Sequence, residues 1–186
     1  MFIRLLGDLT YPSILYIEGL LNKEYKAPAD QEWDTRNNDL YWTGRTSNGK
    51  ASAESDWKSN QRQRFVATVN GLVNNSLSNE FSRDADSYKV RFPAVNQCDE
   101  GVCQKVIQYF GVDDKPDAFD EVHKHKFLFD MDGNVFSRRF YSLMFSHSTV
   151  LKQTMQVEYF DEWLFPWVHY IPVSMVCSNF LFVNFH

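Results

Sequence analysis

The chain has 186 residues, of which 44% are hydrophobic and 16% aromatic, and it carries a formal net charge of −5. A chain of this length can form one domain with a substantial core, or slightly more than one, and its apolar content excludes an intrinsically disordered protein. The negative charge argues against a nucleic-acid-binding protein, which usually presents a basic face.

Neither terminus has the pattern of a membrane-targeting segment. The first 13 residues, MFIRLLGDLTYPS, are too short and too soon interrupted by Asp8 to be predicted as a signal peptide. No apolar run in the sequence is long enough to span a bilayer. The last residues, 176–186 (VCSNFLFVNFH), are apolar without a turn signal or cap, so we expect them to expose hydrophobic surface unless something covers them.

Apolar spacing and turn residues predict several elements before residue 125. The short apolar run Leu40, Tyr41 and Trp42 is typical of a strand, and the Gly, Ser and Asn residues that follow it are typical of a loop. The predicted elements are, in chain order, a strand at 40–42, a helix over 55–74, a turn-rich stretch at 76–103, a helix over 101–110 and a short helix over 117–124.

The cysteines leave two interpretations open. Cys98 and Cys103 are separated by four residues, a spacing that suits a small disulfide loop in an oxidising compartment and suits two free thiols equally well. The triplet Asn74-Asn75-Ser76 is a glycosylation acceptor pattern, which has meaning only if the chain enters the secretory pathway.

The stretch from residue 126 to residue 173 carries the strongest pattern, which predicts strand, glycine turn, helix, strand, helix and strand. Phe127, Leu128, Phe129 and Met131 form a short apolar run typical of a strand buried on both faces, and Gly133 then allows a tight turn. Ser137 stands where a helix N-cap is expected, with Arg138 and Arg139 in the first turn. Since arginines normally avoid the positive end of a helix dipole, this placement predicts a bound anion such as phosphate or pyrophosphate.

Alternating strands and helices predict a parallel α/β sheet. In such sheets the ligand lies beyond the carboxyl ends of the strands, where Gly133 and Arg139 fall. Arg139 as an ordinary surface arginine and Glu158 as a plain helix N-terminal acid remain the alternatives to a binding role.

Asp130 and Asp132 allow two other interpretations. As a DxD pair they could hold a divalent metal ion. As the hhhDxDG motif of haloacid-dehalogenase-like phosphatases, the first would be the nucleophile and the second a general acid. Only 53 residues follow Gly133, and no later acidic pair appears that would hold the magnesium of such a phosphatase, so the phosphatase is kept as an alternative that these features disfavour.

Three segments together resemble glycosyltransferase family 90, the CAP10-domain family of capsule-associated proteins and protein O-glucosyltransferases. LYWTGRTSNG (40–49) resembles the family's aromatic–x–Gly loop, and FLFDMDGNVFSRRF (127–140) its strand–Gly–turn–Ser–x–Arg–Phe signature. VEYFDEWLFPWVHYIPV (157–173) resembles the Glu…Pro-Trp-x-His-Tyr-x-Pro signature and is the most specific of the three. QRQRFV (61–66) and GDLTYPS (7–13) are weaker flanking matches.

The resemblance implies an α/β chain of the GT-B type, with a Rossmann-type donor domain and part of a second α/β domain. It implies transfer of glucose or xylose from UDP-glucose or UDP-xylose to a hydroxyl of a protein or glycan acceptor, with inversion, without a metal and without a further cofactor. Residue by residue, it implies donor contacts that follow the family's motifs: Arg139 at the diphosphate, Ser137 and Gly133 beside it, Glu158 near the nucleoside, and Arg45 in the loop that carries a second diphosphate-contacting arginine.

Two departures from the family pattern bear on activity. Relatives often have an arginine directly before the loop glycine, where this chain has Thr43, and its basic residue, Arg45, follows Gly44. The family's catalytic base is an aspartate upstream of the segment that residues 7–13 match, and no residue here corresponds to it, so the catalytic residue is not assigned.

We therefore interpret the chain as a fragment of the family's fold. The expected divisions are residues 1–75 as part of the acceptor side, 76–175 as the donor domain and 176–186 as an atypical tail. The resemblance also implies the secretory pathway, in the endoplasmic reticulum or Golgi, where full-length relatives are membrane-associated. A donor-binding remnant without turnover is the alternative that the missing base favours.

Overall fold

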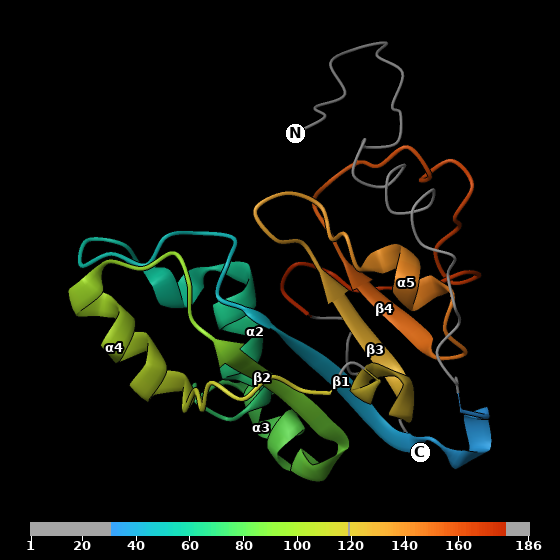
Figure 1. Cartoon of the computed structure of the whole chain (residues 1–186), viewed down its shortest axis with the longest axis horizontal. Helices are drawn as coiled ribbons and strands as arrows, with labels where there is room; N and C mark the ends of the chain where they lie inside the picture. Colours follow the sequence, from blue (N-terminus) through green and yellow to red (C-terminus); the bar gives the residue numbers. More distant parts are fainter. Residues whose placement is uncertain (1–30, 119, 178–186) are drawn as a thin grey trace.

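The protein is an α/β structure built on one parallel sheet. A computed structural model describes residues 31–118 and 120–177 (Figure 1). Five strands lie in the order β2-β1-β3-β4-β5, and every neighbouring pair is parallel. The strands are β1 (Asn37–Arg45), β2 (Tyr88–Ala94), β3 (His125–Met131), β4 (Thr149–Gln153) and β5 (Ile171–Pro172).

Short helices connect these strands. The α-helices are α2 (Gln61–Val69), α3 (Ser76–Ser82), α4 (Glu100–Phe110) and α5 (Phe140–Met144). Single 3₁₀ turns lie at η1 (Trp33–Thr35), η2 (Trp57–Ser59), η3 (Ala85–Ser87) and η4 (Glu121–Lys124). Figure 1 shows α4 beyond β2 at one side of the molecule and α5 beside β3 and β4 at the other. Within the described ranges, none of the helices is long and apolar enough to cross a membrane.

Side chains cover the two faces of the sheet with two separate cores. Alternate strand residues such as Trp42 and Phe129 pack with Phe65 and Val66 of α2 on one face. On the other face, Leu128 and Val150 pack with the first residue of α5 and with Phe160. Because both faces are covered, β3 is buried along most of its length, as its apolar run predicts.

The strand order confirms the predicted α/β class and places a topological switch point. In a parallel sheet of order 2-1-3-4-5, the chain leaves β1 in one direction and β3 in the other, which opens a crevice at the carboxyl ends of β1 and β3. The fold is thus a Rossmann-like sheet. In such sheets the order of the strands alone predicts where a ligand binds, at the switch point between β1 and β3.

Several local predictions are confirmed and others are wrong. The strand at 40–42 and the helix at 101–110 are present. The helix predicted over 55–74 is shorter, because the extended backbone of Asn60 separates it from the preceding 3₁₀ turn and Gly71, with φ +70°, follows its end. The stretch 76–103, expected to be turn-rich, contains α3 and β2.

The helix predicted from Ser137 begins instead at Phe140. The second helix predicted after β4 is absent from the described residues, where 154–170 form turns and one isolated bridge. Its aromatic side chains explain the difference, since Phe160 and Tyr170 both lie against the ring of Phe140, at 5.3 and 5.9 Å between centroids. This segment wraps α5 rather than forming a helix of its own.

The sheet also runs across the division expected at residue 75. β1 lies before that position, yet it pairs with β2 on one side and β3 on the other. Residues 37–75 therefore belong to the same α/β unit as the residues that follow. The segment 7–13 and most of the tail 176–186 lie outside the described residues.

Candidate anion-binding site

Arg62, from the first turn of α2, lies across the carboxyl ends of β1 and β3. Its guanidinium donates to the carbonyl oxygens of Asp132 (2.8 Å), Arg45 (3.0 Å) and Met131 (3.4 Å). The side chain thus ties together the two strands that flank the switch point. It does so with backbone acceptors alone and forms no ion pair with a described carboxylate, although the charges of Asp130 and Asp132 act at longer range to raise its pKa.

The surroundings of Arg62 make that charge costly. The residue is buried, at 8% exposure, and burial together with the nearby charge of Arg139 lowers its pKa to about 10. A buried cation without an ion pair is normally avoided, because desolvation disfavours the charged form. An anion bound beside it would relieve the cost.

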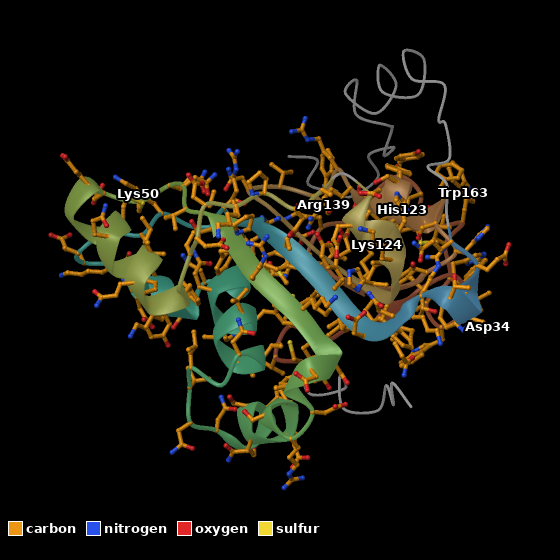
Figure 2. The ribbon with its side chains drawn as sticks, turned by 60° about the horizontal axis from the view of Figure 1, so that its bottom comes forward. Asp34, Lys50, His123, Lys124, Arg139 and Trp163 are labelled. Carbon is orange, nitrogen blue, oxygen red and sulfur yellow. A yellow bond between two sulfur atoms is a disulfide. The ribbon has the colours of Figure 1, made fainter. Side chains whose placement is uncertain are left out.

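Arg139 supplies a second positive charge at the same place. It precedes α5, and its Nη1 donates to the backbone oxygen of Thr43 near the end of β1, at 2.6 Å. Both guanidiniums lie over the ring of Trp42, at 5.7 Å for Arg62 and 6.0 Å for Arg139. Figure 2 shows Arg139 between Lys50 on one side of the view and Trp163 on the other. Its neighbour Arg138 is also exposed, but it makes none of these contacts.

Two glycines let the backbone approach these arginines closely. A Cβ atom on Gly133 would lie 3.4 Å from Nη2 of Arg62, and one on Gly44 would lie 2.8 Å from the ring of Trp42. The turn that the sequence predicts at Gly133 is therefore part of the arginine site.

Ser137 lies beneath this site rather than in it. Its hydroxyl donates to Oδ1 of Asp130, and it makes no side-chain cap for α5, whose N-cap residue is Arg139. The prediction of an anion site here was argued from a helix dipole, and that argument is wrong, because a helix of five residues has only a small dipole. The arginine side chains carry the positive charge instead.

Glu158 is buried on the α5 face and faces Lys152. Its Oε1 lies 3.4 Å from Nζ of Lys152, a side chain that is 1% exposed. Its predicted contact with a nucleoside stays a prediction.

Arg45 takes part in the site through its backbone. Its carbonyl oxygen accepts from Arg62, whereas its side chain is exposed and has no hydrogen bond to any described residue. Its predicted contact with a diphosphate also stays a prediction.

The two aspartates that raised the phosphatase and metal interpretations have structural partners. Asp132 accepts from Thr154 Oγ1 and from the backbone N–H of Met155, each at 2.7 Å, and so fixes the loop after β4. Asp130 is fully buried, and burial raises the pKa of both carboxyls. No group of three or more His, Cys, Asp or Glu side chains suited to a metal is present in residues 31–118 and 120–177. The phosphatase interpretation is not supported.

A disulfide lies next to the loop that follows β1. Cys98 and Cys103 are paired, which resolves the two interpretations left open by their spacing. The segment that contains Cys98 clamps the loop after β1, through the Ala51 N–H to Gln97 O bond (2.8 Å) and a Lys50–Asp99 ion pair (2.6 Å).

Sequence reasoning missed the central roles of Arg62 and Lys152. Arg62 lies in the segment QRQRFV, which the sequence marks only as a flanking match, and its carbonyl partner at Asp132 is 70 positions away. The sequence feature that could have indicated Arg62 is its place at the start of a predicted helix, like that of Arg138 and Arg139.

A comparison with known families finds a match. The family described as Glycosyl transferase family 90 matches residues 18–185. The match confirms the resemblance carried by the three segments and extends through the tail at 176–185, which was expected to fall outside it.

Proposed function

The chain belongs to glycosyl transferase family 90, and from that premise we propose that it transfers glucose or xylose from a UDP-sugar to a hydroxyl group of a protein or glycan. The family makes it a glycosyltransferase, with a sugar donor and an acceptor. The donor, the acceptor and the stereochemistry are the proposed part.

The observation that carries the proposal is the pair of arginine side chains at the switch point. Arg62 and Arg139 place two positive charges beside the carboxyl ends of β1 and β3, and both donate only to backbone oxygens. A diphosphate is the part of a UDP-sugar that such a pair would bind, because guanidinium groups match phosphate oxygens in geometry and charge.

The same pair suits the chemistry of the transfer. In an inverting displacement, the acceptor oxygen bonds to the anomeric carbon while the bond from that carbon to the donor oxygen breaks. The electron pair and a negative charge go to the departing UDP, and a base takes the acceptor proton. Fixed positive groups at the diphosphate stabilise that growing charge, which is the role a metal ion has in other transferases. We propose that the arginines fill this role without a metal.

A non-catalytic UDP-sugar-binding protein is the second candidate. The observation that favours it is that none of the acids in this sequence matches the family's base. Loss of a general base costs roughly 10²–10⁴-fold in rate, so donor binding could persist where turnover is negligible.

The secretory pathway is the proposed location. The Cys98–Cys103 disulfide supports it, because disulfides persist in oxidising compartments. The acceptor triplet at Asn74 is compatible with it, since Asn74 is exposed in the loop before α3.

A transfer assay separates these candidates. The protein is incubated with UDP-glucose or UDP-xylose and a panel of protein and glycan acceptors, and UDP release and sugar incorporation are measured. Acceptor-dependent incorporation supports the enzyme, and saturable UDP binding without incorporation supports the binding protein. Absence of both contradicts the proposed function. Arg62→Met serves as the control, because it should weaken UDP binding by roughly 10- to 100-fold and reduce any incorporation with it.

A further inference from the structure

We propose that Lys152 is a positioning residue for Arg139, holding the turn at residues 137–139 in place from beneath the sheet's carboxyl end. This inference deepens the proposed function and rests on it for the identity of the anion, but the geometry it describes can be tested without any ligand.

The first link runs from Lys152 through Asp130 to Ser137. Nζ of Lys152 lies 3.6 Å from Oδ2 of Asp130, an oxygen that accepts no hydrogen bond within the described ranges. The other oxygen, Oδ1, accepts from the hydroxyl of Ser137. One carboxyl group therefore joins the ammonium of β4 to the start of the turn.

The second link reaches the other end of the same turn. The ammonium of Lys152 lies 3.7 Å from the centroid of the Phe140 ring, a cation–π contact. Phe140 directly follows Arg139 and is fully buried. Lys152 thus holds the residue two positions before Arg139 and the residue one position after it.

Glu158 completes the cluster and keeps the lysine in place, at 3.4 Å from its Nζ. Such a buried cluster is a poor source of stability, because the desolvation of its charges offsets most of their attraction. A positional role explains why charged groups lie here at all, directly under the arginine site.

Arg139 needs such support because its own side chain is exposed and has a single hydrogen bond, to Thr43. Fixing a free arginine side chain in one conformation costs rotamer entropy. A rigid turn restricts Arg139 in advance, so less conformational entropy is lost when an anion binds.

The first test measures the turn directly, in the full chain without ligand. Hydrogen exchange is followed at the Phe140 N–H, which bonds to Ser137 O, and at the Leu143 N–H, which bonds to Arg139 O. Lys152→Met should speed exchange at both by about tenfold or more, while β3 amides change little, because local opening is confined to the turn. Unchanged exchange at the turn overturns the proposal whether or not the protein binds UDP.

Two further variants provide a second test of the link and a negative control. Ser137→Ala breaks the link at its outer end and leaves the Lys152 cluster intact, so it should speed Phe140 exchange even if Lys152→Met does not fold. Lys124→Met removes an ion pair with Glu121 that lies away from the turn, and it should leave turn exchange as in the wild type.

The second test asks whether Lys152 acts through Arg139. UDP and uridine affinities are measured for Lys152→Met, Arg139→Ala and the double variant. If Lys152 positions Arg139, each single change weakens UDP binding about tenfold, and the double variant binds within about twofold of Arg139→Ala alone. Uridine, which lacks phosphates, should lose little affinity. Additive losses, or equal losses for uridine and UDP, contradict the proposal. Absence of wild-type UDP binding would contradict the proposed function, and the exchange result would still decide the role of Lys152.

Discussion

Two arginines, one on strand β2 and one on the helix α2 that packs on the sheet, show how differently one residue type is used in this protein. Arg91 of β2 pairs with Asp113, at 3.0 Å, and with Asp117. Arg62, at the ends of β1 and β3, has only carbonyl oxygens as acceptors. The first arginine forms ion pairs with the protein's own carboxylates, whereas the second forms none with a described residue.

The pKa values follow the same division. Burial lowers the pKa of Arg91, but its hydrogen bond with Asp117 and the charge of that carboxylate outweigh burial and raise it. Burial and the charge of Arg139 instead lower the pKa of Arg62 to about 10. An arginine's partners, rather than its exposure alone, therefore decide whether its pKa is raised or lowered on folding.

The largest expected effect comes from replacing each of these two arginines by methionine. Arg62→Met should weaken UDP binding by roughly 10- to 100-fold, because a charge-assisted hydrogen bond contributes about 1.5–3 kcal/mol. Arg91→Met should lower the melting temperature and leave UDP affinity within about twofold, because its partners are the protein's own carboxylates. Titration calorimetry and thermal melts of both variants test this. Equal losses of affinity would remove the distinction between the two sites.

A smaller effect is expected at the neighbouring pair on the turn. Arg139→Ala should weaken UDP binding by about tenfold, because Arg139 lies beside Arg62 and is held against Thr43, whereas Arg138→Ala should change affinity by less than about twofold. Both side chains are exposed, so exposure does not account for the difference. Affinities from parallel titrations check it, and a larger loss for Arg138→Ala would show that the wrong arginine is assigned to the site.

The smallest effect concerns the carboxyl group under the site. Burial raises the pKa of Asp130 above its ordinary value. Because the folded state then binds its proton more tightly than the unfolded state, stability falls as the pH rises from about 3.9, the usual Asp pKa, through the raised pKa. Asp130→Asn should lack this part of the pH dependence. Denaturant unfolding of both proteins across that pH range measures the difference, and parallel stability curves would contradict it.

The sequence predicts the parts of this site that are local in the chain. The apolar run at 127–131 predicts β3, and Gly133 with Arg139 correctly marks the sheet edge at which the arginines meet. Its position in the sequence predicts a capping role for Ser137, but the hydroxyl donates instead to Asp130 on the preceding strand. Sequence spacing shows helix caps, but it does not show which buried groups compete for the same hydroxyl.

The remaining parts depend on contacts between distant segments. Arg62 becomes central only when α2 is placed against β1 and β3, and Lys152 only when α5 covers its face of the sheet. The missing second helix has a similar cause, since Phe160 is drawn onto Phe140. In each case the contacts between distant segments, rather than local helix or strand propensity, determine the structure and the role of the residue.

The most direct measurement of the central claim is a calorimetric titration of the wild-type protein with UDP, in the presence and absence of a chelator, alongside Arg62→Met. The account predicts saturable binding that is unchanged by the chelator and weakened by roughly 10- to 100-fold in the variant. Binding that requires magnesium, or that Arg62→Met leaves intact, would contradict the claim that the two arginines at the switch point hold the donor's diphosphate.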